Sequence, residues 1–214
     1  MEKVNEIPSS PMDIFLLPVR VHKKLSVKIE GLILAFLFVG VFDMVFHQNI
    51  IKEGIFQGDF LRLALKLILF LVFSLLLGAV DVICTMVPIA EFAMMIGRRS
   101  EKYVSRGLPV IFMKSYALSH LLFIIPSAIY LYSGVDWLTV DMTSPEVIRW
   151  LFAVLIVVSN VMPYFQLGII YRTISIKTRI QVFGKLILVL AMYYWMQLSG
   201  EAIVFFESLL LKLL

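Results

Sequence analysis

The sequence predicts an all-α fold: a polytopic membrane bundle of five transmembrane helices, preceded by an amphipathic interfacial helix. Of the 214 residues, 61% are hydrophobic and 16% are charged, whereas soluble domains are about 45–50% apolar and roughly 25% charged. Five segments are apolar over the length of about 20 residues that a bilayer crossing requires. Basic residues collect at alternate ends of these segments, which is the pattern that bilayer insertion produces.

The chain is expected to divide into a cytoplasmic segment, residues 1–28, and a five-helix transmembrane domain, residues 29–214. In the first segment, Pro11 and Asp13 suit the first turn of a helix, and Pro18 ends or kinks it. Apolar residues recur there at helical spacing with bases beside them. We therefore expect an amphipathic helix on the anionic inner leaflet, with a plain connector as the alternative.

The predicted spans are residues 29–46, 63–96, 115–132, 150–171 and 182–199. The second is longer than one crossing requires, so we expect Pro88 to kink it and its last residues to follow the inner interface. The tail, residues 202–214, is too short to cross again. It either extends the fifth helix or, as we favour, lies on the outer surface.

The connections between the spans predict the orientation. Those after the first and third spans are neutral or acidic, and those after the second and fourth are basic. The positive-inside rule then places the N-terminus in the cytoplasm and the C-terminus outside the plasma membrane. We expect the basic face to contact anionic lipid headgroups or a protein partner, and no nucleic acid. Its residues are Arg98, Arg99, Lys102, Arg106, Arg172, Lys177 and Arg179.

Asp81 lies near the centre of the second predicted span, where a charge costs roughly 2.5–3.5 kcal/mol on insertion scales. Gly78, Thr85, Pro88 and Glu91 recur at steps of three and four residues from it, so they follow one stripe of the helix. A stripe of small and polar residues is expected to face the bundle rather than lipid.

Polar residues of other spans are candidate partners for Asp81. We predict an intramembrane polar site formed by Asp81, Glu91, His120, Asn160 and Gln166. In one interpretation such residues line a path for a proton, an ion or a polar headgroup. In the other they form interhelical hydrogen bonds that fix the packing. Both remain open for Asp81, and packing is favoured for His120, Asn160 and Gln166.

Enzyme motifs are missing from the sequence. It has no G-x-S-x-G, H-E-x-x-H or C-x-x-C motif and no glycine-rich phosphate loop. We therefore expect no enzymatic activity, no catalytic residue and no cofactor. His22, His47 and His120 fall at different predicted depths, so no metal site is predicted. The single cysteine, Cys84, is expected to be a small core residue.

Several stretches carry a family resemblance. Residues 12–26, "MDIFLLPVRVHKKLS", place a short apolar stretch with a proline before the first span. Residues 114–132, "KSYALSHLLFIIPSAIYLY", run from small residues and a tyrosine to a proline. "IRWLFAVLIVVSN" and the later "ISIKTRIQVFGKLILVL" join a tryptophan-led span to the next span through a basic turn. In these features, and in five spans with a cytoplasmic N-terminus, the chain resembles the bacterial-type Yip1-domain family.

Two functional hypotheses follow. The resemblance implies a non-enzymatic membrane protein that organises membrane or binds lipid or protein partners. The alternative is a small transporter or permeation subunit with a polar site around Asp81. Five spans are few for an autonomous transporter, so the alternative favours a homo-oligomer. The sequence identifies neither a substrate nor a partner.

Overall fold

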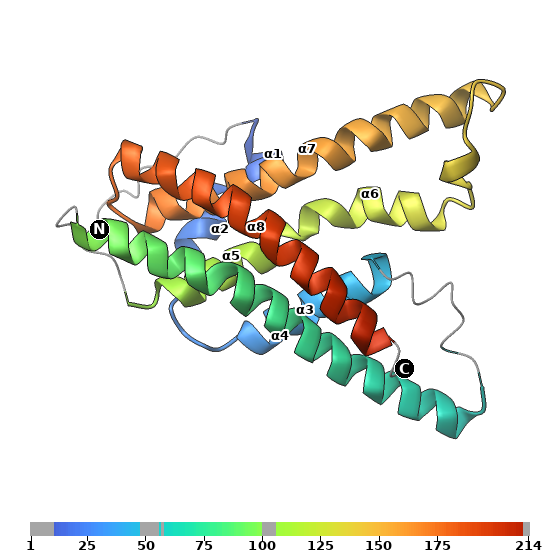
Figure 1. Cartoon of the computed structure of the whole chain (residues 1–214), viewed down its shortest axis with the longest axis horizontal. Coiled ribbons are helices and arrows are strands. Elements are labelled where there is room, and N and C mark those ends of the chain that lie inside the picture. Colours follow the sequence, from blue (N-terminus) through green and yellow to red (C-terminus); the bar gives the residue numbers. More distant parts are fainter. Residues whose placement is uncertain (1–10, 48–55, 57, 100–105, 212–214) are drawn as a thin grey trace, which may run out of the picture.

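The computed structural model describes residues 11–47, 56, 58–99 and 106–211, and it is helical (Figure 1). The all-α prediction is confirmed for these residues. Two short elements are not α-helical: the π-helical turn η1 (Asp43–His47) and the 3₁₀ turn η2 (Trp137–Thr139). The α-helices are α1 (Asp13–Leu16), α2 (Val19–Lys24), α3 (Leu32–Phe42), α4 (Phe60–Arg99), α5 (Leu108–Ser119), α6 (Leu121–Tyr132), α7 (Glu146–Lys177) and α8 (Val182–Leu211).

Within the described residues, four helical segments are long and apolar enough to cross a membrane. They are Phe60–Arg99, Leu108–Tyr132, Glu146–Lys177 and Val182–Leu209. By helix length and hydropathy, the chain is a helical membrane protein. The first predicted span corresponds to a shorter apolar helix, Leu32–Phe46. At about 1.5 Å per residue a helix of that length rises roughly 22 Å, less than the hydrocarbon core of about 30 Å.

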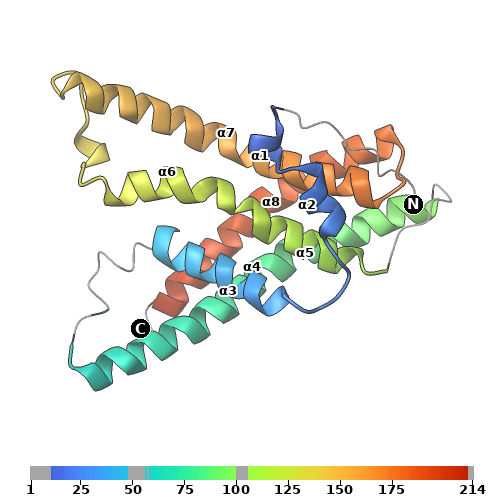
Figure 2. The same ribbon diagram turned by 180° about the vertical axis from the view of Figure 1, so that it is seen from behind.

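Helices α4 and α8 are longer than the spans that the sequence predicts. α4 continues through Pro88 as one helix, and its ribbon shows no sharp bend toward an interface in either view (Figures 1 and 2). α8 begins at Val182, as predicted, but continues to Leu211. The favoured placement of the tail as a separate surface helix was therefore wrong for residues 202–211, which extend α8 instead.

α8 packs against α4 and runs alongside it in both views of the molecule (Figures 1 and 2). The indole nitrogen of Trp195 on α8 donates a hydrogen bond of 3.0 Å to the backbone carbonyl of Cys84 on α4. The Cys84 side chain itself is exposed, so its predicted place in the core was wrong.

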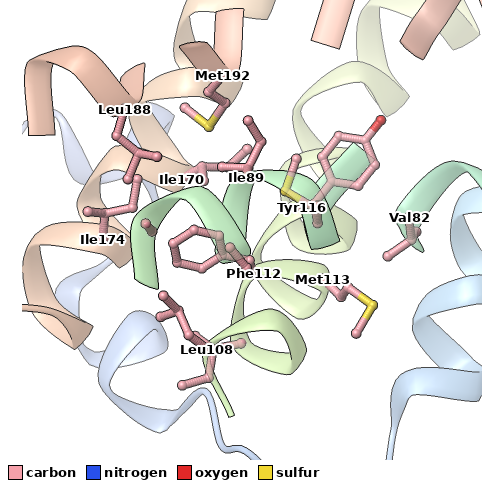
Figure 3. Packing of buried hydrophobic residues seen from close by; sticks show 14 of the residues in the cluster. Val82, Ile89, Leu108, Phe112, Met113, Tyr116, Ile170, Ile174, Leu188 and Met192 are labelled. Carbon is pink, nitrogen blue, oxygen red and sulfur yellow. The ribbon is translucent and has the colours of Figure 1, made fainter. Parts of the chain in front are cut away.

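The apolar core surrounds α5, which packs against α3, α4 and α7. Phe112 is fully buried at its centre, next to Leu108 of its own helix and Ile89 of α4 (Figure 3). Ile170 of α7 and Leu188 of α8 close the same cluster. α5 can approach three helices at once because small buried residues alternate with its large ones (Ser115, Ala117 and Ser119).

The amphipathic helix predicted for the N-terminal segment is instead two short helices, α1 and α2. They separate at Leu17, which has a φ of +60°, and Pro18, so the predicted effect of Pro18 is confirmed. Both helices pack on α7, and the rings of Phe15 and Phe165 stack with centroids 4.6 Å apart.

Candidate functional site

A half-open pocket of about 150 Å³, lined by both acidic and apolar residues, lies between the helices, and we call it the acidic chamber. Its lining comes from η1, α4, α5, the junction of α5 with α6, and α8. The polar side chains of this lining are all buried. They are Asp43, Asp81, Tyr116, His120, Ser199 and Glu207.

Asp81 is held in the chamber wall by hydroxyl groups. The Tyr116 hydroxyl donates to both carboxylate oxygens at 3.1 Å. The Thr85 hydroxyl, one turn further along α4, donates to Oδ1 at 3.0 Å and lies 3.3 Å from the hydroxyl of Ser199 on α8. Asp81 therefore both forms interhelical hydrogen bonds and borders a cavity, so the two interpretations of this residue are compatible.

A close crossing of α3 and α4 brings Asp43 to Asp81. A Cβ atom at Gly40 would lie 1.7 Å from the Ser74 carbonyl oxygen, and one at Gly78 would lie 1.9 Å from the Phe36 carbonyl oxygen. The two helices run in opposite directions along the long axis of the molecule (Figures 1 and 2). Helical side chains lean toward the N-terminus of their helix. The two aspartates, each one turn after its glycine, thus lean toward the crossing from opposite sides.

His120 occupies a break between α5 and α6, which the sequence predicts as one helix. The carbonyl of Tyr116 accepts from the Ser119 hydroxyl at 2.6 Å and from Nδ1 of His120 at 3.0 Å. The backbone N–H of His120 turns to the Ala117 carbonyl instead. Side chains that bond to a helical carbonyl in this way interrupt the helix. The interruption fixes the imidazole at the chamber, where it also contacts the ring of Phe42.

Asp43, Asp81 and His120 each offer a metal-ligating atom, and these atoms all lie within 4.8 Å of one another. Two carboxylates and one imidazole are a donor set that divalent transition metals accept. The sequence predicted no metal site because its three histidines lie at different depths. That argument did not test a ligand set made of one histidine and two aspartates.

Glu207 is a chamber residue that sequence reasoning missed. It is fully buried on the last turns of α8, in the tail that was expected to lie on the membrane surface. Residues 202–211 are apolar except for Glu207 and Ser208 and contain neither proline nor glycine. This is the signal that could have extended the helix and placed Glu207 in the bundle.

The comparisons with known proteins give no analogue for this arrangement: no protein-family model, no curated protein and no solved structure matches the chain. The interpretation of the chamber therefore depends on its own geometry.

The predicted polar site is only partly assembled. Asp81 and His120 meet at the chamber, but Glu91 and Asn160 are exposed. Asn160 donates to the Ile156 carbonyl of its own helix at 2.7 Å. Gln166 is buried on α7, a helix that contributes no described residue to the chamber lining. A single path through all of these residues, as one interpretation of the sequence had it, does not form.

The predicted basic face also divides into two groups. Arg98, Arg99, Arg106 and Arg179 are exposed, and Lys102 lies outside the described residues. Arg172 and Lys177, in contrast, hold the N-terminal segment against α7.

Arg172 forms an ion pair of 2.6 Å with Asp13 and donates to the Leu17 carbonyl at 2.5 Å. Lys177 donates to the carbonyls of Lys23 and Leu25 at 2.8 and 2.7 Å. These two cations thus bind protein groups of the same chain, and their contact with lipid headgroups or a protein partner stays a prediction.

Proposed function

We propose that this protein binds a cation in the acidic chamber and acts as a small transporter or permeation subunit. The observation that carries the proposal is that Asp43, Asp81, His120 and Glu207, from different helical elements, line one cavity of about 150 Å³. Ionisable side chains are rare inside membranes, and where they face a cavity they mark proton or ion pathways.

The proposal includes a topology of five crossings, with the N-terminus in the cytoplasm and the C-terminus outside the plasma membrane. The alternating basic and acidic connections support it. In this topology the short α3 and η1 form the first crossing, and the chamber lies between the two membrane surfaces. The bilayer thins locally or flanking residues reach to the interface where a hydrophobic helix is short.

The test is a flux assay with the full chain in sealed vesicles. Proton entry is followed with a pH-sensitive dye, and Mn²⁺ entry with a metal-sensitive dye. Asp81→Asn keeps the shape of the side chain but removes its charge, so it is expected to abolish flux while the protein remains folded. Glu201→Gln is the matched control, because Glu201 is an exposed acid of α8. Equal flux in the wild type and Asp81→Asn, or no flux above empty vesicles, would contradict the proposal.

Membrane organisation of the Yip1 type, by binding anionic lipid or a protein partner, is a second candidate. It is favoured by a surface hollow of about 500 Å³ in which Arg98 and Arg99 lie beside Glu91, Phe92 and Met95. Cations next to apolar side chains suit a surface that contacts lipid headgroups.

Charge neutralisation tests this second candidate. Changing Arg98, Arg99 and Arg106 together to Gln is expected to weaken binding of the detergent-solubilised protein to phosphatidylglycerol vesicles. Arg62→Gln, at the other end of α4, is the control. Unchanged binding of the triple variant would count against this role.

A further inference from the structure

We infer that Asp43, Asp81 and His120 form a binding site for one divalent transition-metal ion inside the membrane domain. The inference rests on the proposed function for the ion's route, but the site itself is a separate claim. It depends on the geometry of three side chains and on the groups that orient them.

The spacing of the ligating atoms fits a single ion. Oxygen and nitrogen ligands lie about 2.0–2.2 Å from a metal such as Zn²⁺, so two ligands of one ion are separated by roughly 3–4.4 Å. The corresponding atoms of Asp43, Asp81 and His120 lie within 4.8 Å of one another before any ion is bound. Small rotations of the side chains are enough to close this distance.

The histidine is oriented as metal ligands are. Nδ1 of His120 lies 3.0 Å from the backbone carbonyl of Tyr116. A carbonyl oxygen can only accept, so Nδ1 carries the hydrogen, and a neutral imidazole then has its lone pair on Nε2. A backbone carbonyl that fixes the tautomer in this way is a regular partner of a metal-binding histidine.

Asp81 has the same kind of support. Tyr116 and Thr85 donate to its carboxylate from two different helices, which limits its rotation and leaves lone pairs for a further contact. Tyr116 thereby orients both ligands, one through its hydroxyl and the other through its carbonyl. Ligands held by such outer contacts are a recurrent property of metal centres.

The remaining ligands can be supplied at the same place. The chamber of about 150 Å³ has room for water molecules, each of which takes about 30 Å³ in the liquid. Glu207 lines the same cavity, although it is not one of the three residues whose ligating atoms lie within 4.8 Å of one another. The site therefore offers a coordination shell that mixes protein and water ligands.

The donor set selects a class of metal. Mg²⁺ and Ca²⁺ prefer shells made of oxygen, and Cu⁺ prefers sulfur, whereas imidazole with carboxylates suits Zn²⁺, Mn²⁺, Fe²⁺ and Co²⁺. Binding should also release protons, because the imidazole and carboxylates must be deprotonated to ligate.

Equilibrium binding tests the site. The full chain is purified in detergent without metal, and Co²⁺ is added while its visible absorption is recorded. Zn²⁺ binding is measured by calorimetry. We expect one ion per chain, with micromolar or tighter affinity, and displacement of Co²⁺ by Zn²⁺. Asp43→Asn, Asp81→Asn and His120→Gln should each lower the affinity by at least about tenfold.

Glu91→Gln, an exposed acid of α4, is the control and should bind as the wild type does. Tyr116→Phe keeps the ring and both ligands, so its expected loss of affinity tests the orienting role without removing a ligand. A wild-type chain that binds neither ion overturns the site even where a variant fails to fold. Unchanged affinity in all three ligand variants overturns it as well.

The outcomes separate the two proposals. Metal binding without flux in vesicles supports the site and contradicts the transport function. Proton flux that depends on Asp81, without metal binding, contradicts the site and supports the transport function.

Discussion

Nδ1 of His22 lies 2.8 Å from the hydroxyl oxygen of Thr173, although 151 positions separate the two residues in the sequence. The other ring nitrogen, Nε2, lies 2.9 Å from the Leu16 carbonyl and so donates to it. Nδ1 is then the acceptor in a neutral ring, and Ser115 extends the chain of hydroxyl groups at 2.6 Å from Thr173. This network ties the N-terminal segment to α5 and α7.

The network predicts that docking of the N-terminal segment depends on pH. Burial lowers the pKa of His22 from its ordinary 6.5, and the nearby Arg172 lowers it further, while hydrogen bonding to the Leu16 carbonyl and the charge of Asp13 oppose the shift. Because the pKa of His22 is lower in the docked state, its contribution to the free energy of docking is fully present above pH 6.5. That contribution is lost as the pH falls from 6.5 toward the docked-state pKa.

Hydrogen exchange of residues 13–24, corrected for intrinsic rates, should therefore be faster at about pH 5.5 than at about pH 7.5. His22→Gln keeps a hydrogen-bonding side chain that does not titrate in this range, so it should remove most of this difference. A difference of the same size in His22→Gln would assign the pH effect to another group.

The ion pair of Asp13 with Arg172 is expected to contribute to the same docking. Its two side chains are only 15% and 18% exposed, so water screens it less than an ordinary surface pair. A double-mutant cycle of Asp13→Asn and Arg172→Gln, read from thermal unfolding, should give a coupling energy of about 1 kcal/mol. Arg98→Gln, an exposed arginine, should change stability little. Additive effects of the two single changes would show that the pair carries no coupling.

The glycine crossing of α3 and α4 predicts a large effect of one added methyl group. Gly40→Ala and Gly78→Ala would each place a Cβ atom within 2 Å of a backbone carbonyl oxygen, so the helices must separate. Overpacking of this kind costs about 1–3 kcal/mol or more. The same separation would move Asp43 from Asp81.

Thermal unfolding in detergent measures this effect. Gly200→Ala on α8 is the control for the loss of a glycine, since a Cβ atom there has nothing within 4 Å, and it should unfold at or above the wild-type temperature. Wild-type unfolding temperatures for both crossing variants would mean that the helices do not approach as closely as described.

The five-crossing topology predicts that the two chain ends lie on opposite sides of the membrane. In a Cys84→Ser background, a single cysteine at Glu2→Cys or Lys212→Cys is exposed to a membrane-impermeant maleimide in intact cells. Lys212→Cys should react directly, and Glu2→Cys only after permeabilisation. Reaction of both from the same side would mean that the short helix α3 does not cross, and that the long helices alone span the bilayer.

The long helices were predictable because a bilayer permits little else. A spanning segment must satisfy its backbone hydrogen bonds internally and stay apolar for about 20 residues, so hydropathy alone located α7 and the start of α8 at Val182. Asp81 was predictable as a candidate for the same reason, since a charge in such a segment needs an explanation.

What hydropathy does not contain is which side of a helix faces which neighbour. Asn160 and Gln166 lie on the same apolar span, yet Asn160 is exposed and Gln166 is buried away from the chamber. The approach of Gly40 to α4 depends on two helices at once. The break at His120 depends on side-chain bonds to one carbonyl.

Glu207 makes the C-terminus part of the chamber rather than an appendage. By hydropathy alone, deleting the residues after Gly200 would be expected to have little effect, because the four long apolar segments would still be present, the last of them shortened. It would nevertheless take away one wall of the cavity and one of its acids. Truncation within residues 201–211 therefore alters the interior, and an inactive truncated protein would say nothing about the activity of a chain that keeps these residues.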